Sequence, residues 1–382
     1  MTLLTYQDTF TLGVDDISDR VLSGKITFGG DPSNYQISWS TGEIVVENVD
    51  GRFNDVTSAL LRVERPVVGS LAKRHIWSGR ARAVEEPRTL TNIGRKRYVL
   101  QGLLESAIGY QTLVSFEVSN NVGADRVPGG LGAVMEAIVN KMMTAGRITP
   151  DATVDATSSY GVITFSPAIT KTGNEWITDF AVASHTRPMD RNGVGFSMTQ
   201  GPALARNRDG APVIQLNKLL VTEADVLTTI NTVRNDITKK ALDGSTDYTI
   251  IDFDSRREYG NRTLELPAWL PARRNDSPLL QSVLNPIDVI TIRCPRWQTN
   301  EAELALLESM SIGRTVNFVL RDGTNQIANT HAAVTRHSYS WTEDNRQPPE
   351  VLIEAVVYRH THTRTAWRLQ NVGRLQRETF LN

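Results

Sequence analysis

The sequence predicts a mainly β fold with a mixed α/β insertion. Short runs that alternate apolar and polar residues fill the first 110 residues, and runs of the same kind return after residue 230. Between these two regions, apolar residues recur at helical spacing. At about 100–200 residues per domain, a chain of 382 residues suffices for two or three domains.

The first predicted domain, residues 1–110, consists of short strands separated by turn residues. Residues 35–39 and 43–49 alternate with period two, as half-buried strands do. Residues 75–84 and 97–103 have the same character. Many short strands at even spacing are typical of a barrel or a sandwich.

The second predicted domain, residues 111–210, has a different pattern of apolar residues. Helical spacing of apolar residues predicts one helix over residues 130–144 and another over residues 175–185. Residues 196–199 and 213–216 are predicted to pair as a hairpin. We therefore expect a mixed α/β insertion at this point of the chain.

The third predicted domain, residues 211–358, is again rich in strands. A helix is predicted over residues 301–310, where leucines recur at helical spacing. The predicted strands cover residues 230–238, 248–253, 314–320, 332–341 and 351–359.

The last predicted segment, residues 359–382, is a basic arm. From residue 359 to residue 377 it contains no acidic residue, and its basic and aromatic side chains include Arg359, Arg364, Trp367 and Arg368. We interpret the segment as an arm that docks on an acidic surface of a neighbouring chain. Contact with nucleic acid and an unstructured tail are the alternatives.

The overall composition excludes several classes of protein. Lys and Arg number 41 against 42 Asp and Glu, so no global field attracts nucleic acid or an anionic membrane. A single cysteine, Cys294, excludes an intrachain disulfide. The first residues lack a secretory signal pattern, and no apolar run approaches the ~18 residues of a membrane span. We expect a soluble protein made in a reducing cytoplasm.

Charge is nevertheless distributed unevenly along the chain. Residues 1–60 contain nine acidic and three basic residues, a net charge of -6. Residues 61–110 contain ten basic and four acidic residues, a net charge of +6. Either the two segments neutralise each other inside one domain, or they form opposite faces that meet between neighbouring subunits.

No local motif predicts catalysis or ligand binding. The sequence contains no nucleophile elbow, no H-E-x-x-H pair and no phosphate-binding loop. His360 and His362 would share one face of a strand, but no third metal ligand lies near them in the sequence. We therefore predict a non-enzymatic protein with no catalytic, cofactor-binding or metal-binding residues.

One stretch, residues 43–53, resembles a known signature. It ends in Asp50-Gly51-Arg52-Phe53, where the strand enters a turn and Phe53 folds back as an apolar plug. The stretch resembles a motif of tail proteins from tailed bacteriophages, with Val49 in place of the usual arginine. Further short motifs occur in that family's order at residues 65–67, 76–80, 98–102, 258–262 and 311–316. Together they resemble the tail hub, or baseplate hub, proteins that are often labelled minor tail proteins in siphophages.

This resemblance implies a specific architecture and role. Such hubs are homotrimers of a protomer with two tube-like β-barrels, so three chains form a pseudo-hexameric ring. The ring joins the tail tube or distal tail protein to tail-tip or receptor-binding proteins, holds the end of the tape-measure protein and forms the exit channel for double-stranded DNA. The implied location is the tail tip of the virion, after assembly in the host cytoplasm. Two alternatives are a receptor- or carbohydrate-binding tail-tip adhesin and a cell-wall hydrolase.

The basic cluster Arg95, Lys96 and Arg97 is a candidate interface within such a ring. A channel through which DNA slides should not hold phosphate groups tightly, so a basic lining would oppose passage. We therefore predict that this cluster faces a neighbouring protein and not the channel.

Overall fold

The structure is a computed structural model that describes the chain in segments. The described residues are 8–30, 35–67, 72–85, 93–109, 114–116, 131–145, 148, 152–154, 169–184, 186–200, 211–218, 223–229, 231, 233–241, 243–268, 286–295, 301–310, 312–322, 324–342 and 349–357.

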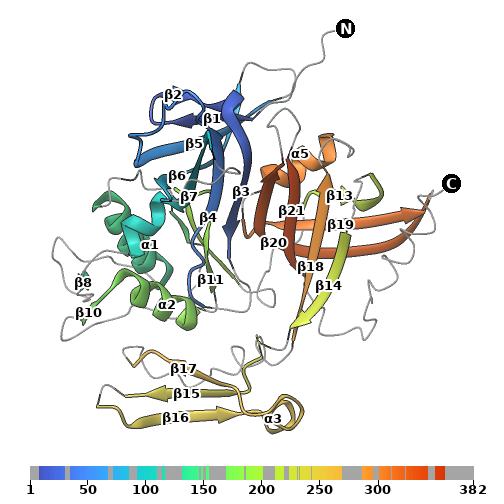
Figure 1. The fold of residues 1–382 in the computed structure, drawn as a ribbon. Coiled ribbons are helices and arrows are strands. Elements are labelled where there is room, and N and C mark those ends of the chain that lie inside the picture. The colour runs from blue at the N-terminus through green and yellow to red at the C-terminus, as the bar shows by residue number, and fades with distance from the viewer. Residues whose placement is uncertain are drawn as a thin grey trace.

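A large curved sheet forms the body of the molecule (Figure 1), and it contains sixteen strands within the described residues. Its central path runs through β14 (Glu223–Thr229), β18 (Ile287–Pro295), β21 (Glu350–Val357), β20 (Asn325–Trp341), β3 (Val21–Gly29), β4 (Thr41–Glu47), β7 (Arg95–Gly102), β6 (Lys73–Ala83), β5 (Ser58–Pro66), β1 (Thr9–Leu12) and β2 (Asp15–Asp16). Side branches are β9 (Ala152–Val154), β11 (Thr186–Asp190), β12 (Phe196–Gln200), β13 (Val213–Gln215) and β19 (Thr315–Asp322).

The two β regions of the chain are joined through one strand pair, β3 with β20. The two strands run antiparallel from the pair Gly29–Arg336 to the pair Gly24–Trp341. Gly29 has a φ of 121°, and a Cβ at this position would lie 2.1 Å from the carbonyl oxygen of Thr335. Only glycine permits this close approach, so Gly29 allows the two halves of the sheet to meet.

One hydrophobic core serves both β regions. It includes Phe10 and Trp77 from the first region and Trp341 and Ile353 from the last. The rings of Phe10 and Trp341 meet edge to face with centroids 5.1 Å apart, an arrangement that aromatic pairs favour. The prediction of a mainly β fold is confirmed. The count of two closed barrels stays a prediction, because strands of both β regions pair in the same sixteen-stranded sheet and share one core.

The helices and short sheets lie around this body. The longer helices are α1 (Leu131–Ala145) and α2 (Gly173–Ser184), and α5 (Glu301–Ser309) packs against the main core. The remaining elements are η1 (Ser18–Arg20), η2 (Glu105–Gly109), η3 (Leu216–Lys218), α3 (Phe253–Tyr259), the pair β8 (Val114–Phe116) with β10 (Ile169–Lys171), and the three-stranded sheet of β15 (Asp236–Lys240), β16 (Thr246–Ile251) and β17 (Thr263–Leu266).

A second hydrophobic core packs α1 and α2 together. Met142, Trp176 and Phe180 are fully buried or nearly so in this core, which explains the helical spacing of apolar residues. Ile237 and Leu264 from the three-stranded sheet belong to the same core. The three-stranded sheet and α3 lie at one end of the molecule, with β17 next to α2 (Figure 1).

Three details of the predicted elements are wrong. Residues 35–39 do not form a strand: they make one isolated bridge, Ser38 with Met189, because their alternating apolar side chains pack on the second core without a ladder partner. Residues 196–200 pair with β11 and β9, while residues 213–215 pair in parallel with β19, so they do not form a hairpin with each other. The strand predicted over 230–238 is also displaced, because residues 233–235 lie between β14 and β15.

Candidate functional site

The predicted turn motif forms the connection between β4 and β5. Gly51 adopts a φ of 70°, which glycine accepts at little cost. The backbone N–H of Phe53 donates to Asn48 Oδ1 at 2.8 Å, and the Phe53 side chain is buried. Ion pairs at 2.7 Å between Arg20 and Asp50 and at 2.5 Å between Arg52 and Asp15 flank the turn. The four motif residues therefore lie together, with Phe53 inside and the charged residues outside.

The predicted basic cluster on β7 divides between the two faces of the sheet. Arg95 and Arg97 are exposed on the outward face, and Arg97 pairs with Glu43 at 2.6 Å. Lys96 lies on the other face, where its Nζ donates to the carbonyl oxygen of Asn54 at 3.0 Å. The alternation of a strand causes this division, since neighbouring side chains point to opposite faces. The predicted arm residues Arg359, Arg364, Trp367 and Arg368 lie outside the described residues.

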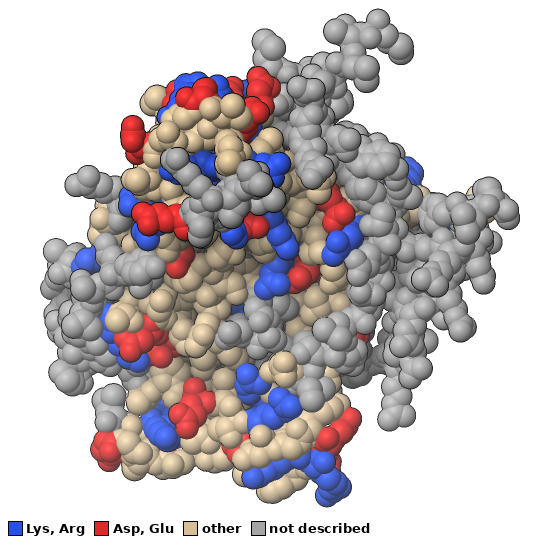
Figure 2. All heavy atoms as spheres, in the orientation of Figure 1, with Lys and Arg blue, Asp and Glu red and all other residues tan. Residues whose placement is uncertain are grey.

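Part of the uneven charge is neutralised within the chain. Asp8 pairs with Arg65 and Glu43 pairs with Arg97, so both ion pairs connect the acidic segment 1–60 with the basic segment 61–110. Basic and acidic side chains also alternate on the face seen in Figure 2. The exposed face of β6 and β7 still carries further arginines, Arg80, Arg82 and Arg95.

A buried cluster of charges connects the two β regions. The guanidinium of Arg65 bonds Asp8 at 2.8 and 2.9 Å and Glu308 at 2.7 Å, and all three side chains are buried. The second carboxylate oxygen of Glu308 accepts from Arg74 at 2.7 Å. Asp8 also accepts from the indole N–H of Trp341 at 3.0 Å. Burial alone would lower the pKa of Arg65, but the two carboxylates outweigh burial and raise that pKa well above its usual range.

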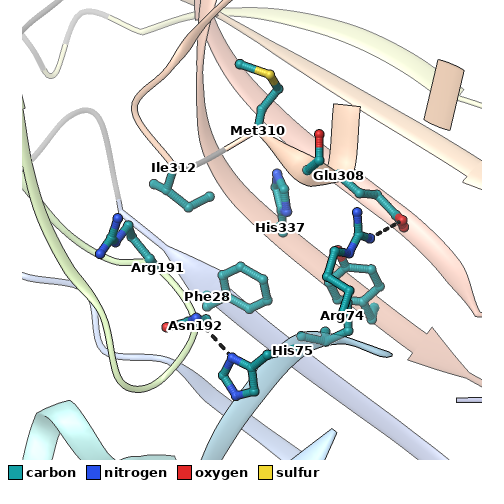
Figure 3. Close-up of a pocket in the computed structure, with 12 residues that line it drawn as sticks. Phe28, Arg74, His75, Arg191, Asn192, Glu308, Met310, Ile312 and His337 are labelled. Carbon is teal, nitrogen blue, oxygen red and sulfur yellow. Dashed lines mark hydrogen bonds and ion pairs between the residues drawn. The ribbon is translucent and has the colours of Figure 1, made fainter. Parts of the chain in front are cut away.

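A pocket of about 260 Å³ lies beside this cluster (Figure 3), where three parts of the chain meet. Its wall contains residues from β3 and β6, from the turn between β11 and β12, and from α5 and β20. Its lining residues are Phe28, Arg74, His75, Ile76, Arg191, Asn192, Glu308, Ser309, Met310, Ile312, His337 and Tyr339. These range from buried His337 to exposed Ser309, so the pocket leads from the interior to the surface.

The turn that carries Asn192 is held in place by a buried carboxylate. Asp190 accepts from the backbone N–H groups of Ser40 at 3.0 Å, Asn192 at 3.1 Å and Gly193 at 2.7 Å. Burial raises the pKa of Asp190, although these hydrogen bonds oppose that shift. Asn192 in turn donates from Nδ2 to His75 Nδ1 at 3.2 Å (Figure 3). This wall of the pocket is therefore fixed through the turn's own backbone.

His337 is the least satisfied polar group of the pocket. Its side chain is buried, and its Nε2 has no hydrogen-bond partner within the described residues. Burial, together with the nearby guanidinium groups of Arg74 and Arg65, lowers the pKa of His337 to about 4, although Glu308 acts in the opposite direction. The imidazole is therefore neutral at pH 7. Sequence reasoning did not single out His337, because it stands alone in an alternating strand with no neighbouring ligand type.

A second cavity, of about 540 Å³, lies along the exposed side of α2. It is lined by Gln36, Ile37, Trp39, Lys171, Asn174, Glu175, Thr178 and Asp179. Trp39 is half-buried against the second core, and Asn174 Oδ1 is buried without a hydrogen bond in the described part of the chain. Lys171 pairs with Asp179, so the lining combines one aromatic side chain with several groups that form hydrogen bonds.

The described residues contain no group of three or more His, Cys, Asp or Glu side chains arranged to hold a metal ion. His360 and His362 lie outside those residues. Among the described helices, none has the length and apolar character that crossing a membrane requires.

The fold is similar to that of two solved tail proteins, whereas no family model and no curated protein matches the sequence. One is the 43 kDa tail protein of prophage MuSo2 from Shewanella oneidensis, with a TM-score of 0.53 and 11% identity, covering 92% of this chain and 98% of that one. The other is the tail protein from Neisseria meningitidis MC58, with a TM-score of 0.52 and 9% identity, covering 92% of this chain and 96% of that one. Over 92% of its length, this chain therefore has a fold similar to that of these tail proteins.

Proposed function

We propose that this chain is a structural subunit of a bacteriophage tail, located at the tail tip as a hub. The observation that carries the proposal is the likeness of fold, which extends over 92% of this chain and nearly all of two tail proteins. The order of the short motifs from residue 43 to residue 316 supports the same assignment. The proposed role is structural, with no enzymatic activity and no catalytic residue.

In the full form of the proposal, three copies close into a pseudo-hexameric ring. This ring joins the tail tube or distal tail protein to the tip proteins, holds the end of the tape-measure protein and encloses the path of the DNA. Among the described strands, the central path of the sheet ends at β14 on one side and at β2 on the other. A ring whose neighbouring subunits cover such edges removes unpaired backbone groups and prevents uncontrolled strand addition.

The proposal is tested in two steps. The native mass of the purified chain is measured alone and after mixing with the tail proteins encoded beside it, and a trimer is expected in at least one condition. A tagged copy is then located by electron microscopy of intact particles. A label along the tail shaft or on the capsid, or a strictly monomeric chain that is absent from particles, contradicts the proposal.

Reversing charge on the outward face of β7 should weaken assembly. In the double variant R95E/R97E, both substituted side chains are exposed. A neighbour that complements this basic face would meet like charges, so we expect self-association at least about ten-fold weaker, since such juxtaposition costs several kcal/mol. Analytical ultracentrifugation measures the effect.

Lys96→Glu is the matched control for this experiment. It reverses one positive charge on the same strand, where the double variant reverses two, but Lys96 faces the other side of the sheet. Both variants should melt close to the parent chain, because the exposed Arg97–Glu43 pair contributes at most about 1 kcal/mol to stability. If the double variant assembled as strongly as the parent chain, this face of β7 would not be part of the ring interface.

The cavity beside α2 favours a second candidate function, binding of a neutral carbohydrate. Trp39 offers an aromatic surface for the C–H face of a sugar, while Asn174, Glu175 and Asp179 supply oxygen atoms that accept from hydroxyl groups. With one lysine against two carboxylates in the lining, the site does not select anions. On a glycan array, we expect specific signals that Trp39→Ala abolishes, whereas signals unaffected by Trp39→Ala would exclude this cavity.

A further inference from the structure

In the pocket between the two β regions, two side-chain acceptors already receive hydrogen bonds, whereas one buried imidazole nitrogen has no partner among the described residues. Glu308 receives Arg65 on one carboxylate oxygen and Arg74 on the other. Asn192 Oδ1 accepts from the backbone N–H of Gly195 at 2.9 Å. By contrast, His337 Nε2 is buried and has no hydrogen-bond partner among the described residues. In the Nε2–H tautomer this nitrogen is a donor, so a ligand that satisfies it brings acceptor atoms.

The charges around the pocket also favour a ligand with acceptor atoms. Its lining contains the guanidinium groups of Arg74 and Arg191 and one carboxylate, that of Glu308. Both histidines of the lining have a pKa below the usual value, so neither adds charge at pH 7. The lining thus carries one net positive charge, and Glu308 is already bound between two arginines. A singly charged anion matches this balance.

Apolar side chains also line the pocket. Phe28, Ile76, Met310 and Ile312 belong to the lining, and Figure 3 shows Met310, Ile312 and Phe28 around His337. An inorganic anion would leave these side chains without a contact, whereas a methylene stem would pack on them. The cavity of about 260 Å³ has room for a group of side-chain size and not for a nucleotide.

We propose that this pocket binds a carboxylate carried on a short aliphatic stem. The carboxylate accepts from His337 and from an arginine of the lining, and the stem packs against the apolar side chains of the lining. Such a group is found both in a free short-chain acid and in the glutamate side chain of a partner protein, and the two sources share this chemistry. This inference is independent of the proposed tail role, because it rests on the pocket alone.

The test uses the full chain with methyl-labelled methionine and isoleucine, so that Met310 and Ile312 report on occupancy by NMR. The probes are glutamate with both backbone ends capped, glutamine capped in the same way, butyrate and inorganic phosphate. We expect capped glutamate to shift the Met310 and Ile312 signals saturably and to bind at least ten-fold more tightly than capped glutamine or phosphate. Equal binding of capped glutamate and glutamine, or no shift at these two residues with any probe, overturns the proposal.

Comparison with butyrate distinguishes the two sources. Tighter binding of capped glutamate than of butyrate indicates a side chain of a partner, and the reverse order indicates a free acid; both outcomes support the carboxylate site. Arg191→Gln, which removes a half-buried guanidinium outside the Arg65 cluster, should weaken binding several-fold. Arg257→Gln, on exposed α3, is the matched control and should leave binding unchanged.

The pH dependence of binding tests whether the ligand contacts His337, because a purely structural role of His337 would not couple its protonation to ligand binding. A bound carboxylate stabilises the protonated imidazole, so its affinity should rise as the pH falls from 7 towards 5. The charged groups that face His337 are Glu308 on α5, Arg74 on β6 and Arg65 on β5, and Glu308 remains bound to both arginines. In His337→Phe, with the fold verified by thermal melting, this pH dependence should disappear; its persistence would show that His337 does not contact the ligand.

Discussion

Replacing Arg65 with methionine should lower the free energy of unfolding by about 3–5 kcal/mol, the cost typical of breaking a buried ion pair by removing one partner. Arg65 lies between the buried carboxylates of Asp8 and Glu308, which it bonds at 2.7 to 2.9 Å. Without Arg65, Asp8 still accepts from the neutral indole N–H of Trp341, and Glu308 still accepts from Arg74, but both lose the guanidinium that they share. Two carboxylates would then remain buried without the positive charge of Arg65, which offsets the cost of removing them from water.

Denaturant unfolding followed by fluorescence measures this loss. Arg97→Met is the matched control, because it removes the same kind of side chain from an exposed ion pair with Glu43 and should cost at most about 1 kcal/mol. In the Arg65→Met background, Asp8→Asn together with Glu308→Gln should recover part of the stability, since both buried charges are then gone. A loss no larger than that of Arg97→Met would show that the cluster contributes little to holding the β regions together.

The fold class could be predicted because each strand and helix shows its own pattern. Apolar spacing alone predicts a helix over 130–144, which is one residue from the observed α1 (Leu131–Ala145), and its buried side chains Ile138 and Met142 pack in the second core. Local alternation of apolar and polar residues likewise predicts strands over 314–320, 332–341 and 351–359, which correspond to β19, to the second part of β20 and to β21. The alternation did not predict the first residues of β20, 325–331. Residues 35–39 show the limit of this signal, since the same alternation arises when one extended segment packs on a core without pairing.

The pocket and the charge cluster could not be predicted in this way. Arg65 and Glu308 are 243 positions apart in the sequence, and each is ordinary in its own surroundings: one ends a strand and the other lies in a helix. His337 becomes distinctive only when β3 pairs with β20 and brings Phe28 opposite it. Charge counting did reveal that the first 110 residues contain segments of opposite sign. It could not reveal that Asp8 pairs with Arg65 inside the molecule.

Acid should destabilise this protein through His337. The pKa of this group is about 4 in the folded chain and 6.5 in its unperturbed form. Below pH 6.5 the unfolded chain therefore binds a proton that the folded chain excludes, so stability falls as the pH drops and continues to fall until about pH 4. The difference in pKa corresponds to a loss of about 3 kcal/mol over this range, at 1.36 kcal/mol per unit.

Comparison with His337→Phe isolates this contribution from that of the other titrating groups. Phenylalanine keeps an aromatic ring next to Phe28 and Tyr339 but cannot take up a proton. Unfolding free energies are measured for both chains at several pH values between 4 and 7.5, and the difference between them should grow as the pH falls. A constant difference would mean that the folded chain accommodates the protonated ring, for example through Glu308. The pocket would then tolerate a positive charge at His337, and the cost expected from burial would be absent.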